Sequence, residues 1–130
     1  MANEAVCIET PTRFARRTIA DASSVPIGSI MALTDPNTVA VSNANDQVFG
    51  GIAWEEKTAN DGIVEMTVAL DGVWEVKLKD EAVGAGALLK ISGANEVGLA
   101  ANADAETGRI FAKAEEAGQN NRKRVRLFGY

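Results

Sequence analysis

The 130-residue sequence contains no histidine, a single cysteine and only seven aromatic residues. Without histidine, Ser-His-Asp and Cys-His nucleophile systems and every histidine-containing metal site are excluded. The lone cysteine, Cys7, excludes an intrachain disulfide and CxxC chemistry, and we interpret it as a small apolar contact residue because no histidine can activate its thiol. Seven aromatic residues leave little material for a surface on which nucleic-acid bases stack. These shortages weigh against most enzyme mechanisms.

The residues that are present are typical of one soluble domain. Hydrophobic residues make up 46% of the chain and charged residues 24%, which is an ordinary globular composition. No stretch approaches the ~20 apolar residues of a membrane-spanning helix. The N-terminus has an acid at Glu4 and lacks the basic start and apolar stretch of a secretory signal. We therefore expect no membrane contact, and a protein made in the cytoplasm that leaves it only inside a larger particle.

The net charge of −5 is unevenly distributed along the chain. Residues 1–25 are neutral overall, residues 26–107 carry −9, and residues 108–130 carry +4. An acidic body with a basic end favours self-complementary contacts between copies, but ordinary scattered surface charge explains the same distribution equally well.

Four short blocks of sequence occur twice in the same order, and each contains apolar residues beside a glycine or a turn asparagine. The matched blocks are 27–34 with 85–92, 37–41 with 95–99, 50–53 with 108–111 and, one deletion later, 68–72 with 125–129. Four ordered matches with one gap rarely arise by chance, so we infer an internal duplication. The two units are expected at about residues 26–72 and 84–129.

The pattern within the units predicts β-strands. Residues 63–70 alternate between two faces after an Asn-Asp-Gly hairpin signal, and residues 122–128 alternate in the same way. Helical signals are confined to residues 80–83 and a weak patch around 13–17. We therefore predict an all-β protein with at most one or two short helices, built as a small β-sandwich or barrel-like body from a duplicated β unit.

Residues 1–24 lie outside the matched blocks and show little periodicity. We expect them to form an extended N-terminal arm that precedes a single β-rich domain over residues 25–130. Such an arm commonly pairs with a neighbouring sheet edge or lies on another chain.

No motif in the chain indicates chemistry. Residues 84–86 begin a GxG, but Leu89 occupies the place of the third glycine of a dinucleotide fingerprint. Residues 102–106 alternate oxygen ligands, but Lys113 occupies the place of the bidentate glutamate of a calcium loop. The basic residues at 122–126 alternate like the outer face of a strand in an acidic chain. We expect no enzyme activity, cofactor, metal site or direct nucleic-acid binding.

The glycine-led blocks also occur in a recognisable order. The first set is Val25-Pro26-Ile27-Gly28 and Phe49-Gly50-Gly51-Ile52-Ala53, and the second is 86–89, 108–112 and 125–129. Over about residues 25–129 this order resembles the capsid decoration (cement) proteins of tailed double-stranded DNA phages. The second set departs from that family's pattern, because Arg109 replaces a glycine and Phe111 replaces a small residue.

The resemblance implies a structural virion protein on the capsid exterior. Proteins of that family generally form homotrimers on three-fold axes, where they clamp adjacent major capsid proteins and stabilise the expanded head. A trimer that engages three weak sites gains avidity of roughly 10²–10⁴.

Two groups of residues are candidates for these contacts. The capsid-contact candidates are Arg13, Phe14, Arg16 and Arg17, because they combine basic and apolar character outside the repeat. The trimer-contact candidates are Arg122, Arg124 and Arg126, which would meet the acidic body of a neighbour. The alternative function is a ligand- or carbohydrate-binding module that uses Trp54 and Trp74, although tryptophans in so aromatic-poor a chain more often pack in the core.

Overall fold

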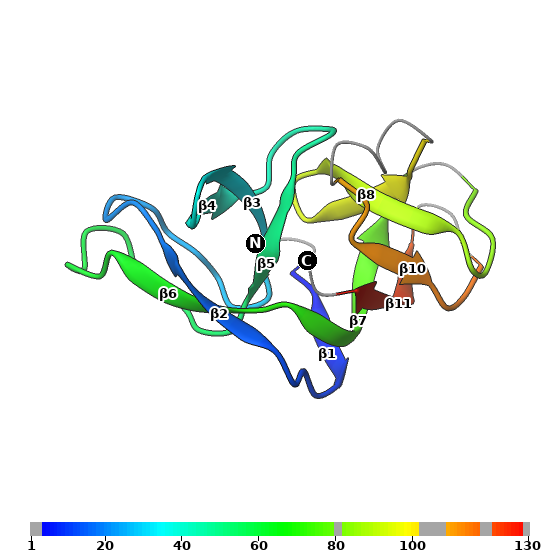
Figure 1. Cartoon of the computed structure of the whole chain (residues 1–130), viewed down its shortest axis with the longest axis horizontal. Coiled ribbons are helices and arrows are strands. Elements are labelled where there is room, and N and C mark those ends of the chain that lie inside the picture. The colour runs from blue at the N-terminus through cyan, green and yellow to red at the C-terminus, as the bar shows by residue number, and fades with distance from the viewer. Residues whose placement is uncertain (1–3, 80–81, 102–108, 118–120, 129–130) are drawn as a thin grey trace.

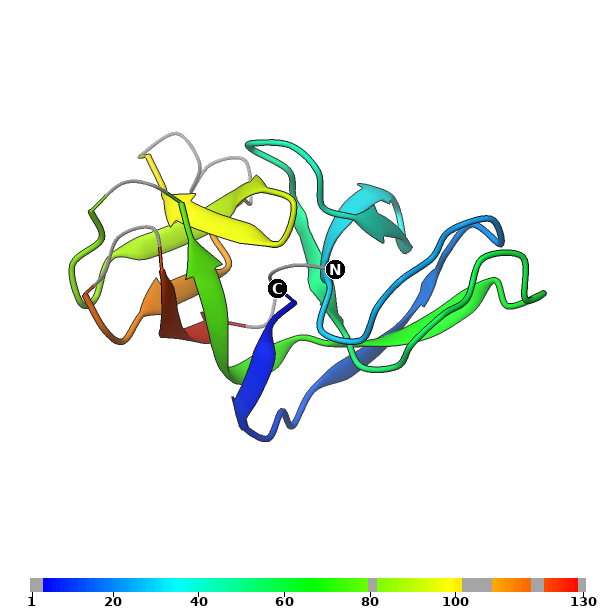
Figure 2. The ribbon, with the colours of Figure 1, turned by 180° about the vertical axis from the view of Figure 1, so that it is seen from behind.

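The computed structural model describes residues 4–79, 82–101, 109–117 and 121–128. Over these residues the chain forms eleven β-strands and two closed five-stranded barrels that lie side by side (Figures 1 and 2). The predicted all-β, barrel-like fold is therefore confirmed. Within the same residues no helix is long and apolar enough to cross a membrane. The possible helical turn at 80–83 begins at residues that lie outside those described.

Each barrel is closed by one parallel pair of strands. The first barrel contains β2 (Phe14–Thr18), β3 (Ile30–Asp35), β4 (Thr38–Val41), β5 (Phe49–Ala53) and β6 (Glu65–Ala69). The second contains β7 (Asp71–Leu78), β8 (Leu88–Gly93), β9 (Glu96–Leu99), β10 (Ala112–Ala114) and β11 (Arg122–Phe128). The ring orders are β2-β4-β3-β5-β6 and β7-β11-β10-β8-β9, with parallel closure at β2–β4 and β7–β9. The additional strand β1 (Val6–Glu9) pairs with β7.

The two barrels have the same topology, so the predicted duplication is a structural one. Ser42 N donates to Ile30 O at 2.9 Å in the first barrel, and Ala100 N donates to Leu88 O at 3.0 Å in the second, 58 residues later. Matching positive φ angles of 90° and 87° also occur at Gly28 and Gly86. The spacing of 57 residues for the last block is also confirmed. Val68 in β6 pairs with Ala53, and Val125 in β11 pairs with Ala114, which is the residue equivalent to Ala53 in the second barrel.

The third sequence match was wrong by three residues. Ala53 N donates to Ser29 O, and Ala114 N donates to Ala87 O, both at 2.9 Å. Because Ser29 and Ala87 are 58 residues apart, Ala53 corresponds to Ala114 at a spacing of 61. The segment that leads into β10 is therefore three residues longer than the segment that leads into β5.

The structure also places β2 inside the first barrel, within the segment that we expected to be an arm. Ile19 N donates to Val64 O at 3.0 Å, as Leu78 N donates to Asn121 O at 2.8 Å in the second barrel. Strand β2 thus corresponds to β7, with Ile19 equivalent to Leu78, and the repeated units begin with these two strands. The helical signal around residues 13–17 was wrong, because pairing with β4 and β6 overrides weak local propensity.

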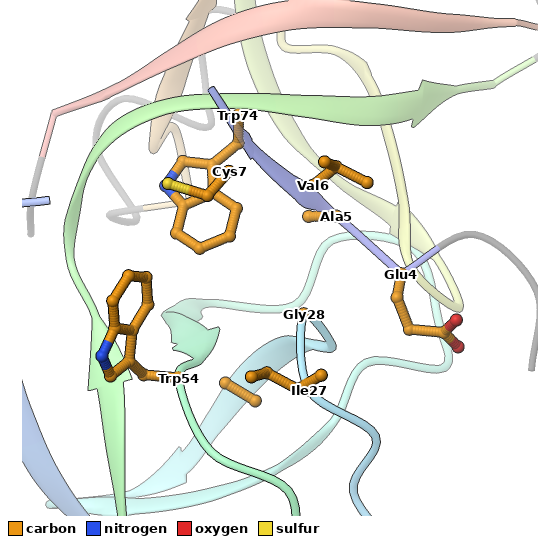
Figure 3. Close-up of a pocket in the computed structure, with 9 residues that line it drawn as sticks. Glu4, Ala5, Val6, Cys7, Ile27, Gly28, Trp54 and Trp74 are labelled. Carbon is orange, nitrogen blue, oxygen red and sulfur yellow. The ribbon is translucent and has the colours of Figure 1, made fainter. Parts of the chain in front are cut away.

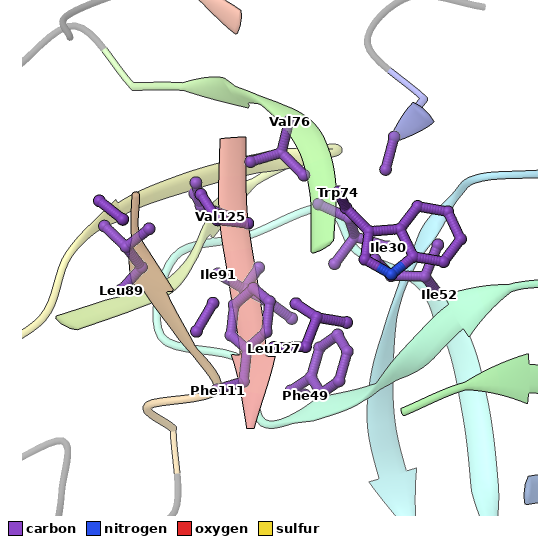
Figure 4. Packing of buried hydrophobic residues seen from close by; sticks show 14 of the residues in the cluster. Ile30, Phe49, Ile52, Trp74, Val76, Leu89, Ile91, Phe111, Val125 and Leu127 are labelled. Atoms are coloured by element: carbon purple, nitrogen blue, oxygen red, sulfur yellow. The ribbon is translucent and has the colours of Figure 1, made fainter. Parts of the chain in front are cut away.

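One hydrophobic core extends across both barrels (Figure 4). The outer faces of β3 and β5 contribute Ile30 and Ile52, which are fully buried against the second barrel. Phe49 stacks on Phe111 with ring centroids 4.1 Å apart and an interplanar angle of 9°. The interior of the first barrel forms a separate cluster around Met31, Met66 and neighbouring residues. The first barrel therefore buries side chains both inside itself and on its outer face.

Polar contacts connect the β8–β9 turn to the first barrel. Asn95, which is buried, accepts a hydrogen bond from Ile30 N at 2.8 Å through its Oδ1 atom. The backbone N of Asn95 donates to Ser42 Oγ at 3.0 Å. The side-chain oxygen and the backbone N–H of Asn95 thus both bond to residues of the first barrel, and these two hydrogen bonds fix the relative position of the barrels.

Candidate interaction surface

Residues 4–13, which we call the strap, run across both barrels. At one end Ala5 N donates to Gly28 O of the first barrel at 2.8 Å, and Arg122 Nη2 of the second barrel donates to Glu4 O at 2.6 Å. In the middle, β1 pairs with β7. At the other end the Asp71 carboxylate accepts hydrogen bonds from the backbone N–H groups of Thr12 and Arg13. The strap is therefore held at three places along its length.

The Asp71 carboxylate is held by strong local hydrogen bonds. Burial alone would raise the pKa of Asp71, but hydrogen bonds from the Thr12 hydroxyl and from the backbone of Arg13 and Thr12 outweigh burial and leave the pKa below its ordinary value of 3.8. Asp71 is also the first residue of β7, directly after the single residue that separates the barrels. The carboxylate thus ties the strap to the connection between the two barrels.

An apolar groove of about 500 Å³ lies between the strap and the first barrel (Figure 3). Its lining residues are Glu4, Ala5, Val6, Cys7, Ile27, Gly28, Ala53, Trp54 and Trp74. Ile27 and Val6 are 54% and 51% exposed, so two large apolar side chains of the lining are open to solvent. The groove thus combines depth with exposed apolar walls, as binding sites do.

The aromatic residues at one end of the groove differ in accessibility. Trp54 is 37% exposed, whereas Trp74 is only 3% exposed and donates its indole N–H to Asp71 O at 3.0 Å. The two indoles meet edge to face, with centroids 6.0 Å apart. Phe14, which is 44% exposed, packs against Trp54 at 5.2 Å without lining the groove. Trp54 is therefore the aromatic side chain that a partner in the groove would contact.

Glu4 lies at the end of the groove away from the two tryptophans (Figure 3). Its Oε2 atom is buried and has no hydrogen-bond partner in the described part of the chain. A carboxylate oxygen shielded from water without a donor is unfavourable. Because Glu4 lines the groove, a donor or cation of a bound partner would meet an acidic side chain at this end.

Cys7 lies in the wall of the groove, partly buried against the shared core. Burial raises the pKa of its thiol above the ordinary value. Its location agrees with the interpretation of Cys7 as a small apolar contact residue.

The four capsid-contact candidates lie on or beside β2. Arg13 precedes β2, where its backbone joins Asp71 of β7 and Leu70. Arg16 approaches Glu55 at 3.3 Å and Glu65 at 3.7 Å, and Arg17 donates to Asn37 Oδ1 at 3.2 Å. Only Phe14 among the four lies against a groove residue.

The three trimer-contact candidates form ion pairs within their own chain. Arg122 pairs with Glu75 at 3.0 Å, and Arg124 pairs with Glu116 at 3.4 Å. Arg126 pairs with Glu115 at 2.8 Å and with Glu9 at 3.3 Å, and the hydrogen bond with Glu115 raises the pKa of the guanidinium above its ordinary value. A contact between copies through these side chains would therefore compete with internal partners.

Sequence reasoning missed the groove itself, including Glu4, Val6 and Ile27. The row of apolar residues at 5–8 was a signal that this segment packs against the protein, but it does not specify the strand that the segment meets. Among the residues that the structure describes, no group of three or more Cys, Asp or Glu side chains is placed to hold a metal ion. Comparison of the chain with protein-family models and with curated proteins gives no match.

Proposed function

We propose that this protein is a structural virion component that binds the outer surface of a phage capsid as a homotrimer and stabilises the expanded head by clamping adjacent major capsid proteins. The proposal joins the resemblance of the glycine-led blocks to the geometry of the strap and groove. The observation that carries it is the exposed apolar side chains at the strap and the facing barrel wall, where Val6 and Ile8 of the strap are 51% and 45% exposed and Ile27 of the first barrel is 54% exposed. Val6 and Ile27 both line the groove, and exposed apolar side chains gathered at one site are characteristic of a protein-binding face.

The fold supports a role under mechanical load. Two closed barrels leave few unpaired strand edges, and their shared core and buried Asn95 connect them into one body. The capsid face would be formed by the strap and groove together with Phe14, and Arg13, Arg16 and Arg17 would lie on the neighbouring β2 surface. Arg122, Arg124 and Arg126 remain the proposed contacts between copies in the trimer.

Binding to phage heads that lack this protein tests the proposal directly. The purified protein is expected to sediment with the heads, to occupy their three-fold axes in electron cryomicroscopy, and to raise the temperature at which they release DNA. A β-rich protein of similar net charge is the control for charge-driven adsorption. Failure to sediment with heads at any tested concentration would contradict the proposal.

The trimer is tested separately by reversing two charges. Arg124→Glu with Arg126→Glu places like charges beside Glu115 and Glu116, and would repel an acidic neighbour. We expect the double variant to lose trimer mass, as measured by light scattering of the free protein and by occupancy on heads. An unchanged trimer in both measurements would remove these arginines from the interface.

The carbohydrate-binding alternative is less well supported by the geometry. A sugar platform needs exposed aromatic faces, and Trp74 is almost completely buried while Trp54 is only partly exposed. A glycan array that gave specific binding lost in Trp54→Ala, with no binding to heads, would favour this alternative.

A further inference from the structure

We propose that the groove holds an extended apolar peptide segment of the partner protein, which pairs with the free edge of β1 and places a basic side chain at Glu4. The assignment of that segment to the major capsid protein rests on the proposed function. The chemistry of the groove itself rests on three observations, namely an unpaired strand edge, apolar walls and a carboxylate without a partner.

The first observation is the direction of the backbone groups of β1. Because Leu78 N donates to Asn121 O beside β11, the even-numbered residues of β7 face β11 and Glu75 faces β1. Val6 lies opposite Glu75 and uses its backbone groups on that side. The next residue, Cys7, therefore directs its N–H and C=O away from β7, toward the groove.

This edge of β1 has no neighbouring strand in the described part of the chain. Strand β1 is the terminal strand of its sheet, with β7 as its one neighbour. Ala5, two residues before Cys7, is already bonded to Gly28 on the same side. An added strand would continue the sheet from this point, with backbone hydrogen bonds to Cys7.

The second observation is the nature of the walls. The strap contributes Val6 and the first barrel contributes Ile27 and Trp54, so alternate side chains of an inserted strand would meet apolar surface. Together with the backbone edge, apolar walls supplied by two separate chain segments favour an extended peptide over a compact ligand.

The third observation sets the charge of the occupant. Glu4 lines one end of the groove and its Oε2 atom has no donor in the described part of the chain, so a lysine or arginine side chain of the occupant that reaches the carboxylate would pair with it. Glu9, farther along the strap, already pairs with Arg126. The preference for a basic residue is therefore expected at the Glu4 end of the groove.

A peptide titration tests the groove without requiring capsids. The probes are acetyl-Lys-Thr-Val-Thr-Val-Thr-Lys-amide, whose lysines and valines share one face of an extended strand, and the same peptide with glutamate at both ends, which makes the comparison independent of strand direction. Binding is followed by NMR through the amides of Cys7 and Gly28 and the indole N–H of Trp54. We expect saturable shifts at these three groups, with the lysine peptide binding at least ~10-fold more tightly.

Variants separate the contributions of charge and shape. Glu4→Gln is expected to reduce the preference for the lysine peptide to less than ~3-fold, because it removes the charge and keeps the size. Trp54→Ala and Ile27→Ser are each expected to weaken binding of both peptides at least ~10-fold. Val64→Ala is the matched control, because Val64 is 54% exposed but does not line the groove. NMR spectra of each variant verify that it folds.

The outcomes distinguish the inference from the proposed function. If neither peptide shifts the three groups, or if Glu4→Gln leaves the preference intact, the inference is overturned. If wild-type protein and Trp54→Ala bind heads equally, the inference falls and the proposed function stands. If the peptides bind as expected but wild-type protein does not bind heads, the inference stands and the proposed function falls. Self-association that Trp54→Ala abolishes would identify a second copy as the occupant and overturn the inference.

Discussion

The two barrels contain a natural control for the attachment of the strap. Gly28 and Gly86 occupy equivalent turns, with φ angles of 90° and 87°, and each donates its N–H to an alanine carbonyl, Ala53 O at 2.9 Å and Ala114 O at 2.7 Å. Their surroundings differ. A Cβ at Gly28 would lie 2.4 Å from Ala5 O, whereas a Cβ at Gly86 would have no heavy atom within 4 Å. The same substitution therefore tests backbone strain alone at one site and strain plus displacement of the strap at the other.

The expected loss of stability has two contributions, the backbone strain at both glycines and the displacement of the strap at Gly28 alone. An alanine at positive φ destabilises the folded protein by roughly 1–2 kcal/mol. Replacing glycine also lowers the conformational entropy of the unfolded chain, which stabilises the folded protein by about 0.4–1 kcal/mol. Gly86→Ala should therefore lower the free energy of unfolding by about 1 kcal/mol. Gly28→Ala must also move Ala5, whose N–H bonds to Gly28 O, so the hydrogen bond and the packing beneath the strap are lost as well. These losses add about 2 kcal/mol, for a total of about 3 kcal/mol.

Urea unfolding followed by tryptophan fluorescence measures both free energies, and amide hydrogen exchange at Ala5 reports directly on the strap. Gly28→Ala should speed exchange at Ala5, and Gly86→Ala should leave it unchanged. The reasoning is refuted if the two variants differ by less than about 0.5 kcal/mol and Ala5 exchanges at the same rate in both.

Two further predictions concern charged groups outside the groove. Lys57 has a side chain only 1% exposed, with Nζ donating to Asp21 O at 2.7 Å and Asp61 Oδ1 at 2.9 Å. Lys57→Met should lower the free energy of unfolding by about 2 kcal/mol, since carbonyl partners lose a charged donor. It should also return the pKa of Asp61, which the hydrogen bond from Lys57 lowers, toward 3.8, as measured by NMR; an unshifted Asp61 would show that Lys57 is not the cause. Because the pKa of Asp71 is below 3.8 in the folded protein, its stabilising contribution is complete above about pH 3.8 and is lost as the pH falls through the lower folded value. Asp71→Asn should therefore lose less stability than wild type between pH 6 and pH 2 in urea titrations, and equal losses would contradict this assignment.

The sequence was sufficient to predict the duplication because apolar strands and glycine turns leave a pattern in the chain. The blocks containing Ile30 and Leu88 match at 58 residues, and they form equivalent strands. Strand β2 left no such pattern. Its residues Phe14, Arg16 and Thr18 are exposed, while Ala15 and Arg17 are only partly buried, so no apolar alternation marks it. Its existence depends on backbone pairing with β6, more than 45 residues away.

The groove could not be predicted for a related reason. Its walls come from the strap, the turn at Ile27 and the indole of Trp54, which meet only because β1 pairs with β7. Nothing local in residues 4–9 indicates that pairing. In the same way, the arginines of β11 were correctly identified as a polar strand face, but their partners Glu75, Glu115 and Glu116 are specified by the register of the barrel.

The difference between the two barrels explains why the groove forms beside Gly28. Ile30 and Ile52 lie on the outer face of the first barrel and are completely buried against the second. Their equivalents in the second barrel are Leu88, which is 44% exposed, and Lys113, which is exposed. An outer face that carries Lys113 cannot close another barrel as the isoleucine face does, because the charge would lose its hydration. The duplication therefore gives one internal junction, and the strap crosses that junction at Gly28 while the equivalent position at Gly86 stays open.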